Sequence, residues 1–431
     1  AMKDEASSLV DNPHRINHRV LFKSTGVQME TDQMVLCSFL DAGKAGNDKP
    51  TGQLVAYNLK NGQALTPSYK EIPCDTSCLA CLGGIVIDNN SHFVVFSKAL
   101  STFQIVNFGK EKPVAKFFGH EKLTCIVGNE KFVFAGTSAG SVCVWQISNG
   151  EMISMLKSIH FQAISSLALS GHYLVTASED GTVKVWDYLK IGIEYEITAK
   201  YSFADHTSQV SGIKLGIVGA NECRLYTCGA DGNLFVYDLY DGLKLAKFVV
   251  PSPCTCLEID ALERMICIGS ADGAIYLLNL EMNAPQIQAN IDKSGFDSIE
   301  AEMCLRALDS KSVTSLCFSL DNGTLVAGYS DGKVLFWDIQ SRQLMRTVTG
   351  TGAVTNIKCF FKSPITKQSK SVKFTPFNRN MTEKSLGYSI DLSEPQDDVV
   401  KEAPKSSNTQ NDLASINHQL FEYIKGQVEN N

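Results

Sequence analysis

One short pattern recurs five times along the chain: small residues, a turn of the Asp-Gly kind, and a β-rich run ending in an aromatic or apolar residue. The copies span residues 137–147, 177–188, 229–239, 270–280 and 329–339. Their turn glycines, Gly140, Gly181, Gly232, Gly273 and Gly332, are separated by 41, 51, 41 and 59 residues. A period of about 40 to 45 residues is typical of propeller blades, and insertions in loops explain the longer intervals. The repeat therefore predicts a β-propeller.

Each copy also has the flanking sequence that a four-stranded blade needs. Asp-Gly supplies the positive φ of a tight hairpin, and the runs on either side are apolar or alternating, as strands are. Another apolar run precedes each hairpin, at residues 164–169, 210–215, 255–259 and 313–318. A fourth follows, for example at residues 243–249 and 343–348. Four strands per repeat are therefore expected.

Two weaker copies, at residues 51–59 and 101–108, precede the five clear ones. Aligning all copies places one residue of each in the slot that tryptophan occupies in WD repeats. The series is Tyr57, Val106, Trp145, Trp186, Tyr237, Leu278 and Trp337. All three tryptophans of the chain fall in this slot. We therefore predict an all-β, seven-bladed WD-repeat propeller over residues 15–361, with residues 19–24 as the N-terminal strand that closes the ring.

The character of the chain changes outside that range. Residues 1–14 are expected to be a flexible N-terminus, and residues 362–410, rich in Lys and Ser with four prolines, an extended linker. Residues 411–428 are periodic and predict an amphipathic helix. Its apolar stripe comprises Leu413, Ile416, Leu420, Phe421, Tyr423 and Ile424. Such a stripe needs a surface to cover it, so the helix is expected to bind a partner or a second copy.

Composition narrows the class of protein. Hydrophobic residues make up 44% of the chain, enough for a large core, and the formal net charge of −7 disfavours nonspecific nucleic-acid binding by the whole surface. We see no run long enough to cross a membrane and no apolar secretory segment, so no membrane association is expected. The fourteen cysteines sit mostly in apolar strand patterns, which indicates small buried side chains in a reducing compartment.

Two groups of polar residues match the hydrogen-bonded tetrad that joins WD blades. His160, Ser178, Asp180 and Trp186 have its order, and His206, Asp231 and Tyr237 repeat it with tyrosine in place of tryptophan. A Ser, His and Asp set also invites a hydrolase interpretation, but no nucleophile elbow is visible around Ser178. We therefore expect a structural role for both groups and no catalytic residue.

Three further features bear on ligands or partners. Cys74, Cys78 and Cys81 form C-x₃-C-x₂-C, but only His92 lies near as a fourth ligand, so no metal is expected. No glycine-rich phosphate motif opens a helix, so no cofactor is expected. The acidic stretch at residues 291–302 is an insertion before the seventh blade, either a solvated loop or a docking loop.

The central region narrows the family. The run Asp205-His206-Thr207, the segment 224–227 ahead of the Asp231-Gly232 turn, and Pro251-Ser252-Pro253 ahead of the segment 269–273 are the most specific features. They resemble the WD-repeat subunit, called Ipi-type in fungi, of the Rix-type pre-60S ribosome maturation complex. Residues 19–26 and 352–357 are similar as well, so the resemblance spans nearly the whole chain. Tyr237, where many relatives carry Trp, and the degenerate second blade depart from the pattern.

This resemblance implies a non-enzymatic scaffold in the nucleus, in both nucleolus and nucleoplasm. It implies a helical-repeat Rix-type scaffold subunit and a small third subunit as partners. Through the complex it implies docking of a large, midasin-type AAA+ ATPase on the pre-60S particle during processing of an internal transcribed spacer. The rival interpretation is a WD-repeat substrate receptor of a ubiquitin ligase, or a reader of histone tails or other peptides, with a pocket at the rim or channel mouth.

Overall fold

The computed structural model describes the parts of the chain that form strands and their turns. These are residues 33–41, 51–69, 79–80, 92–97, 102–107, 113–118, 121–129, 131–146, 151–191, 197–216, 223–280, 282–283, 299–300, 303–306 and 311–361. The chain divides into two compact units, Ala1–Tyr388 and Ser389–Asn431, and all described strands belong to the first. The N-terminal segment 1–14, the linker 362–410 and the helix 411–428 lie outside the described residues, so those predictions stay predictions.

The described strands form seven sheets, numbered I to VII here, each written from its first strand to its last. Sheet I is β29 (Ala353–Phe361), β1 (Gln33–Asp41), β2 (Thr51–Asn58) and β3 (Ala64–Tyr69). Sheet II is β4 (Leu79–Ala80), β5 (His92–Ser97), β6 (Thr102–Asn107) and β7 (Pro113–Phe118). Sheet III is β8 (Leu123–Gly128), β9 (Phe132–Thr137), β10 (Val142–Gln146) and β11 (Met152–Leu156).

The remaining four sheets come from the clearest repeats. Sheet IV is β12 (Ile164–Ser170), β13 (Tyr173–Ser178), β14 (Val183–Asp187) and β15 (Tyr201–Phe203), with a 3-10 helix η1 (Tyr188–Lys190) after β14. Sheet V is β16 (Val210–Leu215), β17 (Arg224–Gly229), β18 (Asn233–Asp238), β19 (Lys244–Val249) and β23 (Ile299–Glu300). Sheet VI is β20 (Cys254–Ile259), β21 (Met265–Ser270), β22 (Ala274–Asn279) and β24 (Met303–Arg306). Sheet VII is β25 (Val313–Phe318), β26 (Thr324–Tyr329), β27 (Lys333–Asp338) and β28 (Leu344–Thr349).

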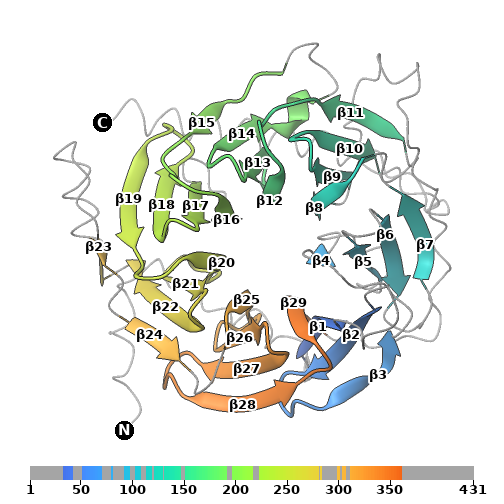
Figure 1. The fold of residues 1–431 in the computed structure, drawn as a ribbon, viewed down its shortest axis with the longest axis vertical. Coiled ribbons are helices and arrows are strands. Elements are labelled where there is room, and N and C mark those ends of the chain that lie inside the picture. The colour runs from blue at the N-terminus through green and yellow to red at the C-terminus, as the bar shows by residue number, and fades with distance from the viewer. Residues whose placement is uncertain are drawn as a thin grey trace, which may run out of the picture. The chain divides into compact units, whose positions relative to one another are not determined.

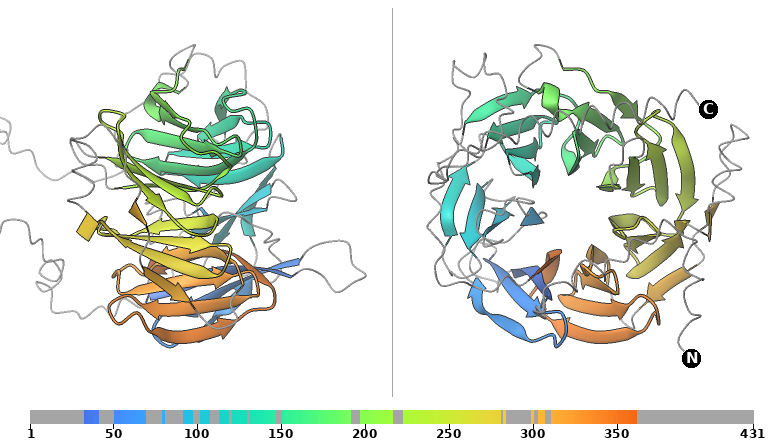
Figure 2. Two further views of the ribbon diagram at one scale, coloured as in Figure 1. Left: turned by 60° about the vertical axis from the view of Figure 1, so that its left-hand side comes forward. Right: turned by 180° about the vertical axis from the view of Figure 1, so that it is seen from behind.

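The sheets stand around a ring with the first strand of each nearest the centre and the last at the rim (Figure 1). The view from behind shows the same circular arrangement (Figure 2). The five turn glycines have φ between 74° and 86°, the conformation their hairpins require. The predicted all-β propeller is confirmed, and the predicted first strands at 210–215 and 313–318 match β16 and β25.

The ring closes where the two ends of the described chain meet in sheet I. β29 pairs antiparallel with β1, for example Val35 with Cys359 and Leu36 with Lys358. The prediction that residues 19–24 close the ring is therefore wrong: β1 pairs with the C-terminal strand, and residues 19–24 lie outside the described residues. The pairing of β1 with β29 joins residues as far apart in the chain as Val35 and Cys359, and apolar character alone does not indicate such a partner.

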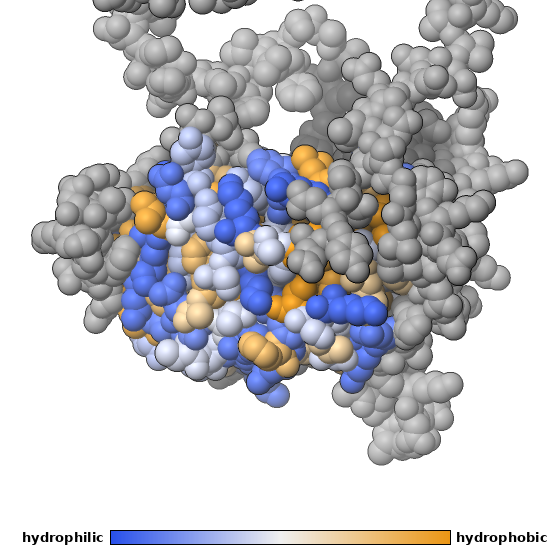
Figure 3. Space-filling model, turned by 90° about the horizontal axis from the view of Figure 1, so that it is seen from above, coloured by the Kyte–Doolittle hydropathy of each residue, from blue (hydrophilic) through white to orange (hydrophobic). Residues whose placement is uncertain are grey.

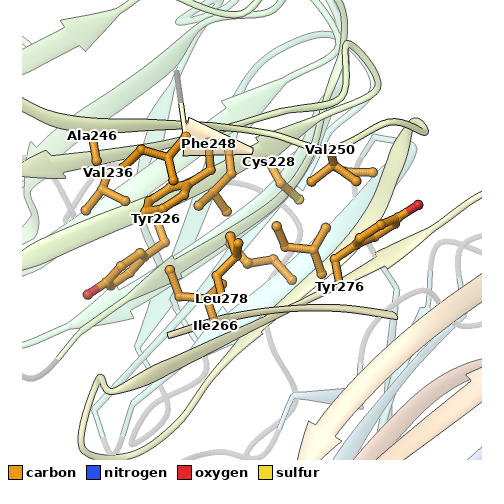
Figure 4. Packing of buried hydrophobic residues seen from close by; sticks show 14 of the residues in the cluster. Tyr226, Cys228, Val236, Ala246, Phe248, Val250, Ile266, Tyr276 and Leu278 are labelled. Carbon is orange, nitrogen blue, oxygen red and sulfur yellow. The ribbon is translucent and has the colours of Figure 1, made fainter. Parts of the chain in front are cut away.

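The tryptophan slot lies on the third strand of every sheet. Its seven residues come from β2, β6, β10, β14, β18, β22 and β27, and all are buried. A residue there packs between its own sheet and the preceding one, as Tyr237 does between sheets V and IV, so the slot selects large apolar side chains. Neighbouring sheets share such cores: Tyr226, Phe248, Ile266 and Leu278 meet between sheets V and VI (Figure 4).

Alternating strand directions give the ring two faces. Turns from a first to a second strand, and from a third to a fourth, emerge on what we call the lower face, as at residues 260–264 and 239–243. Turns from a second to a third strand, and loops that lead to the next sheet, emerge on the upper face, as at residues 179–181 and 157–163.

In one view from the side, the described surface is mostly hydrophilic with isolated hydrophobic patches (Figure 3). Within the described residues no helix has the length and apolar character to span a membrane.

Candidate functional site

The polar centre of sheet IV is a chain of buried hydrogen bonds around His160. Its Nε2 lies 2.7 Å from Thr176 Oγ1 and its Nδ1 lies 2.8 Å from Thr182 Oγ1. Trp186 Nε1 donates to the same Thr176 oxygen at 3.1 Å, and the Thr182 hydroxyl donates to Asp180 Oδ1 at 2.6 Å. The hydroxyl of this tetrad therefore belongs to Thr176.

The prediction that Ser178 supplies this hydroxyl is wrong. Ser178 Oγ donates to the Gln162 carbonyl at 3.3 Å and accepts the Asp180 amide at 3.1 Å. Thr176 and Ser178 lie on the same face of β13. Thr176 is two residues closer along the strand to Leu174, the residue that pairs with Trp186. The turn that carries Asp180 is thus tied to Ser178, while the indole and imidazole meet at Thr176.

One arrangement of protons satisfies every hydrogen bond of this network. Trp186 Nε1 donates to Thr176, Thr176 donates to His160 Nε2, His160 Nδ1 donates to Thr182, and Thr182 donates to Asp180. This arrangement needs a neutral imidazole, and burial lowers the pKa of His160 to about 4. Burial opposes the charge on Asp180, but hydrogen bonds from Thr182 and from the Phe161 amide hold the pKa of Asp180 below its ordinary value. The network around His160 therefore holds the turn that carries Asp180 in a single conformation.

Sheet V repeats the plan with different partners. His206 Nε2 lies 2.9 Å from Thr227 Oγ1, and its Nδ1 lies 3.2 Å from both carboxylate oxygens of Asp231. Burial opposes the charge on Asp231, but the bonds from His206 and Asn233 hold its pKa well below the usual range. Asp231 also accepts the Thr207 amide at 3.1 Å, so the carboxylate fixes the loop that leads into β16.

Tyr237 lies in the tryptophan place of this centre, where the Thr227 side chain is one hydrogen-bond partner of its hydroxyl, but it also makes bonds that Trp186 does not. Its hydroxyl donates to Asp205 Oδ2 at 2.9 Å, and Lys244 Nζ binds the other oxygen of Asp205 at 2.6 Å. A phenol oxygen sits at the far tip of the ring and can both donate and accept, so Tyr237 reaches the Asp205 carboxylate as well. Tyr237 stacks on Phe203 with ring centroids 4.1 Å apart and stays buried.

Sheet VII has a tryptophan, Trp337, in the slot but no hydroxyl at the position that Thr176 holds in sheet IV. Ala327 occupies the position of Thr176, and Tyr329 that of Ser178. Trp337 Nε1 and Tyr329 Oη are buried without a hydrogen-bond partner. Unpartnered polar atoms in the interior destabilise a fold, so this blade relies on apolar packing instead. Trp337 and Tyr329 belong to one buried cluster with Leu325 and Leu335.

A set of hydroxyls on first strands joins consecutive sheets, and sequence reasoning missed it. The second residue of each strand donates to the carbonyl of the first residue of the next sheet's first strand. The bonds are Thr124 to Ile164 at 2.6 Å, Ser165 to Val210 at 2.6 Å, Ser211 to Cys254 at 2.7 Å, and Thr255 to Val313 at 2.6 Å. The signal was present: an apolar residue followed by Ser or Thr begins each of these strands. We call these four bonds the hydroxyl clasp.

Cys267 and Cys317 are buried, as the strand patterns indicated. Cys74, Cys78 and Cys81 lie outside the described residues. Near the end of the acidic insertion at residues 291–302, Ile299 and Glu300 form β23, which pairs parallel with β19, with Ile299 opposite Phe248. The two residues of β23 are therefore part of sheet V and not a solvated loop. The rest of that insertion is not described.

Comparisons with known proteins agree with this geometry. A family model described as "WD domain, G-beta repeat" matches residues 154–187, and one described as "Vps8 beta-propeller" matches residues 254–370. A computationally designed protein, Ika8, is similar in structure over 74% of this chain and 90% of its own, with a TM-score of 0.51 and 20% identity, which bears on the fold alone. Fold and blade centres together define a WD-repeat β-propeller.

The similar curated proteins narrow that class. The chain is 24% identical to "Pre-rRNA-processing protein crb3/ipi3" of Schizosaccharomyces pombe, covering 82% of this chain and 84% of the relative. It is 28% identical to "Pre-rRNA-processing protein IPI3" of Meyerozyma guilliermondii, over 60% and 63%. It is 26% identical to "WD repeat-containing protein 18" of Rattus norvegicus, over 54% of each. The chain is an Ipi-type WD-repeat protein.

Proposed function

We propose that this chain is a nuclear scaffold subunit in pre-60S ribosome maturation, needed for processing of pre-rRNA at an internal transcribed spacer. The observation that carries the proposal is the similarity to a pre-rRNA-processing protein over 82% of the chain. Ribosome assembly takes place in the nucleolus and nucleoplasm, so the proposal places the protein there.

The blade centres support a non-catalytic role. The Ser, His and Asp residues that resemble hydrolase groups are occupied with structural bonds: Ser178 with Gln162, and His160 with Thr176 and Thr182. A base with a pKa of about 4 is also poorly matched to proton abstraction near neutral pH. A closed ring held by these centres and by the hydroxyl clasp offers rigid faces on which partners can dock.

The proposed partners follow from the family resemblance. They are a helical-repeat Rix-type subunit and a small third subunit, with a midasin-type AAA+ ATPase and the pre-60S particle reached through the complex. The predicted helix at residues 411–428 is the proposed assembly element, either toward a partner or toward a second copy. Burying two large apolar side chains of its stripe contributes about 3–6 kcal/mol, enough to decide assembly.

Depletion of the protein in its own cells, with rescue by a tagged copy, tests the function. The expected result is accumulation of spacer-containing pre-rRNA on depletion, and co-purification of large-subunit assembly factors with the tagged copy. Normal pre-rRNA after depletion refutes the proposal. Recovery of ubiquitin-ligase subunits or histones in place of assembly factors would favour the receptor or reader interpretation.

The helix is tested by Leu420→Asp combined with Ile424→Asp in the full chain. Release of the partner, or conversion to monomers, is expected, with an unchanged melting temperature of the propeller. Ser415→Asp with Gln419→Asp adds the same charge at the same spacing off the stripe and serves as the control. Unchanged co-purification and unchanged oligomeric mass in the stripe variant rule the helix out as the assembly element.

A further inference from the structure

Exposed apolar side chains gather on one face of the ring. Nine large apolar side chains of the described residues are exposed, and six of them belong to turns of the lower face. Of the other three, Phe161 lies on the upper face, and Leu344 and Met345 lie on the outer strand β28. Single exposed apolar residues are ordinary, but six in the turns of one face, in four consecutive sheets, mark an interaction surface.

Four turns of sheets V to VII carry the centre of this surface. They are residues 238–243, 260–264, 319–323 and 338–343, and we call them the acidic apolar patch. Tyr240 is 59% exposed, Leu262 52% and Leu320 43%. Leu243, at the end of the first turn, is 56% exposed.

The turns present these side chains on fixed backbones. The Tyr240 amide donates to Asp238 Oδ1 at 2.8 Å, and the Tyr240 carbonyl accepts the Tyr201 hydroxyl of sheet IV at 2.7 Å. The Leu320 amide donates to Gln33 Oε1 of sheet I at 3.1 Å. Turns whose backbone is fixed before binding lose less freedom when a partner arrives, so their exposed side chains are suited to act as anchors.

The same four turns carry a clear excess of negative charge. They hold six carboxylates and two arginines. The carboxylates are Asp238, Asp241, Asp260, Glu263, Asp321 and Asp338. One of the two arginines, Arg264, lies 3.6 Å from the buried Asp260. The surface that a partner meets is therefore apolar at the turn tips and acidic around them.

We propose that the acidic apolar patch binds an amphipathic segment of a partner protein whose side chains are apolar on one face and Lys or Arg beside it. Apolar residues of that segment pack on Tyr240, Leu262 and Leu320, and its cations lie against Asp241 and Asp321. Charge complementarity selects a basic segment over an acidic one. This inference rests on the proposed scaffold function and adds a place and a chemistry for one partner.

Fluorescence anisotropy with three labelled 18-residue peptides tests the proposal on the full chain. One peptide consists of Leu and Lys at amphipathic spacing, the second replaces every Lys with Glu, and the third replaces every Leu with Ser. The first is expected to bind about tenfold or more tightly than either of the others. The triple variant Tyr240→Ser, Leu262→Ser, Leu320→Ser is expected to weaken its binding about tenfold at an unchanged melting temperature.

Matched variants keep the proposal refutable. Phe161→Ser removes a still more exposed apolar side chain, 97% exposed, from the upper face and is expected to leave binding of the Leu and Lys peptide unchanged. Asp241→Asn with Asp321→Asn is expected to weaken binding and flatten its salt dependence. Equal binding of the Glu peptide, equal loss in Phe161→Ser, or no loss in the triple variant overturns the proposal. Self-association that the triple variant abolishes overturns it in favour of a second copy.

The outcome is separable from that of the proposed function, because the peptide assay contains no ribosomal component. Normal pre-rRNA after depletion together with intact peptide binding would remove the function and keep the surface. Defective pre-rRNA processing with no peptide binding would keep the function and remove the surface.

Discussion

The choice between Thr176 and Ser178 as the hydroxyl of the sheet IV centre can be tested directly. Thr176→Val keeps the shape of the side chain and removes the oxygen that contacts both His160 and Trp186. Trp186 Nε1 then loses its acceptor, and His160 Nε2 loses its donor, in a buried site. Each unsatisfied buried group costs about 1–3 kcal/mol, so the variant is expected to lose about 2–5 kcal/mol of unfolding free energy.

Ser178→Ala is the matched variant, two residues along the same strand and equally buried. It removes a 3.3 Å bond to the Gln162 carbonyl and the acceptor of the Asp180 amide. The imidazole and the indole keep their partners, so the expected loss is about 1 kcal/mol. Urea unfolding at neutral pH, followed by tryptophan fluorescence and circular dichroism, measures both midpoints and slopes. A Ser178→Ala loss equal to or larger than that of Thr176→Val refutes the assignment.

Three further expectations follow from the same contacts. Trp186→Phe is expected to cost about 1 kcal/mol more than Trp337→Phe in urea unfolding, because only the Trp186 N–H gives up a bond; equal losses contradict this. The pKa of His160 falls from 6.5 to about 4 on folding, so between these pH values the unfolded chain binds more protons than the folded chain. The free energy of unfolding is therefore expected to rise with pH from about 4 to 6.5 and then level off. A His160→Gln variant whose unfolding free energy changes with pH in the same way contradicts this. Ser211→Ala removes the hydroxyl-clasp bond to the Cys254 carbonyl and is expected to speed amide hydrogen exchange in β16 and β20 more than in β8. An equal increase of the exchange rate in all three strands contradicts this.

Much of the fold could be read from local sequence. The 40-residue period, the Asp-Gly turns and the tryptophan slot depend on residues close together in the chain, and hairpin geometry converts them directly into strands. That is why Tyr57 and Val106, in copies with little else in common with the rest, still mark third strands of their sheets. Burial of the slot is a property of every blade and does not depend on which blade comes next.

Candidate sites were less predictable, because they join residues from different strands. Thr176 and Ser178 both lie on the inward face of β13, and sequence order cannot tell which hydroxyl meets an indole eight to ten residues away. Tyr237 was predicted to take the place of a tryptophan, but its further bond to Asp205, which Lys244 also binds, joins residues of a loop and two strands and could not be predicted from residue order.

The sequence by itself determined the repeat, the strand order within blades, the buried slot and the resemblance to Ipi-type proteins. Tertiary structure alone decided the pairing of β29 with β1, the parallel addition of β23 to β19, the hydroxyl clasp and the gathering of exposed apolar turns on the lower face. The physical reason is separation along the chain. Turns and strands form between neighbours, whereas the clasp spans about 40 to 58 residues and ring closure joins the two ends of the described chain, so these contacts exist only once the sheets have packed into a ring.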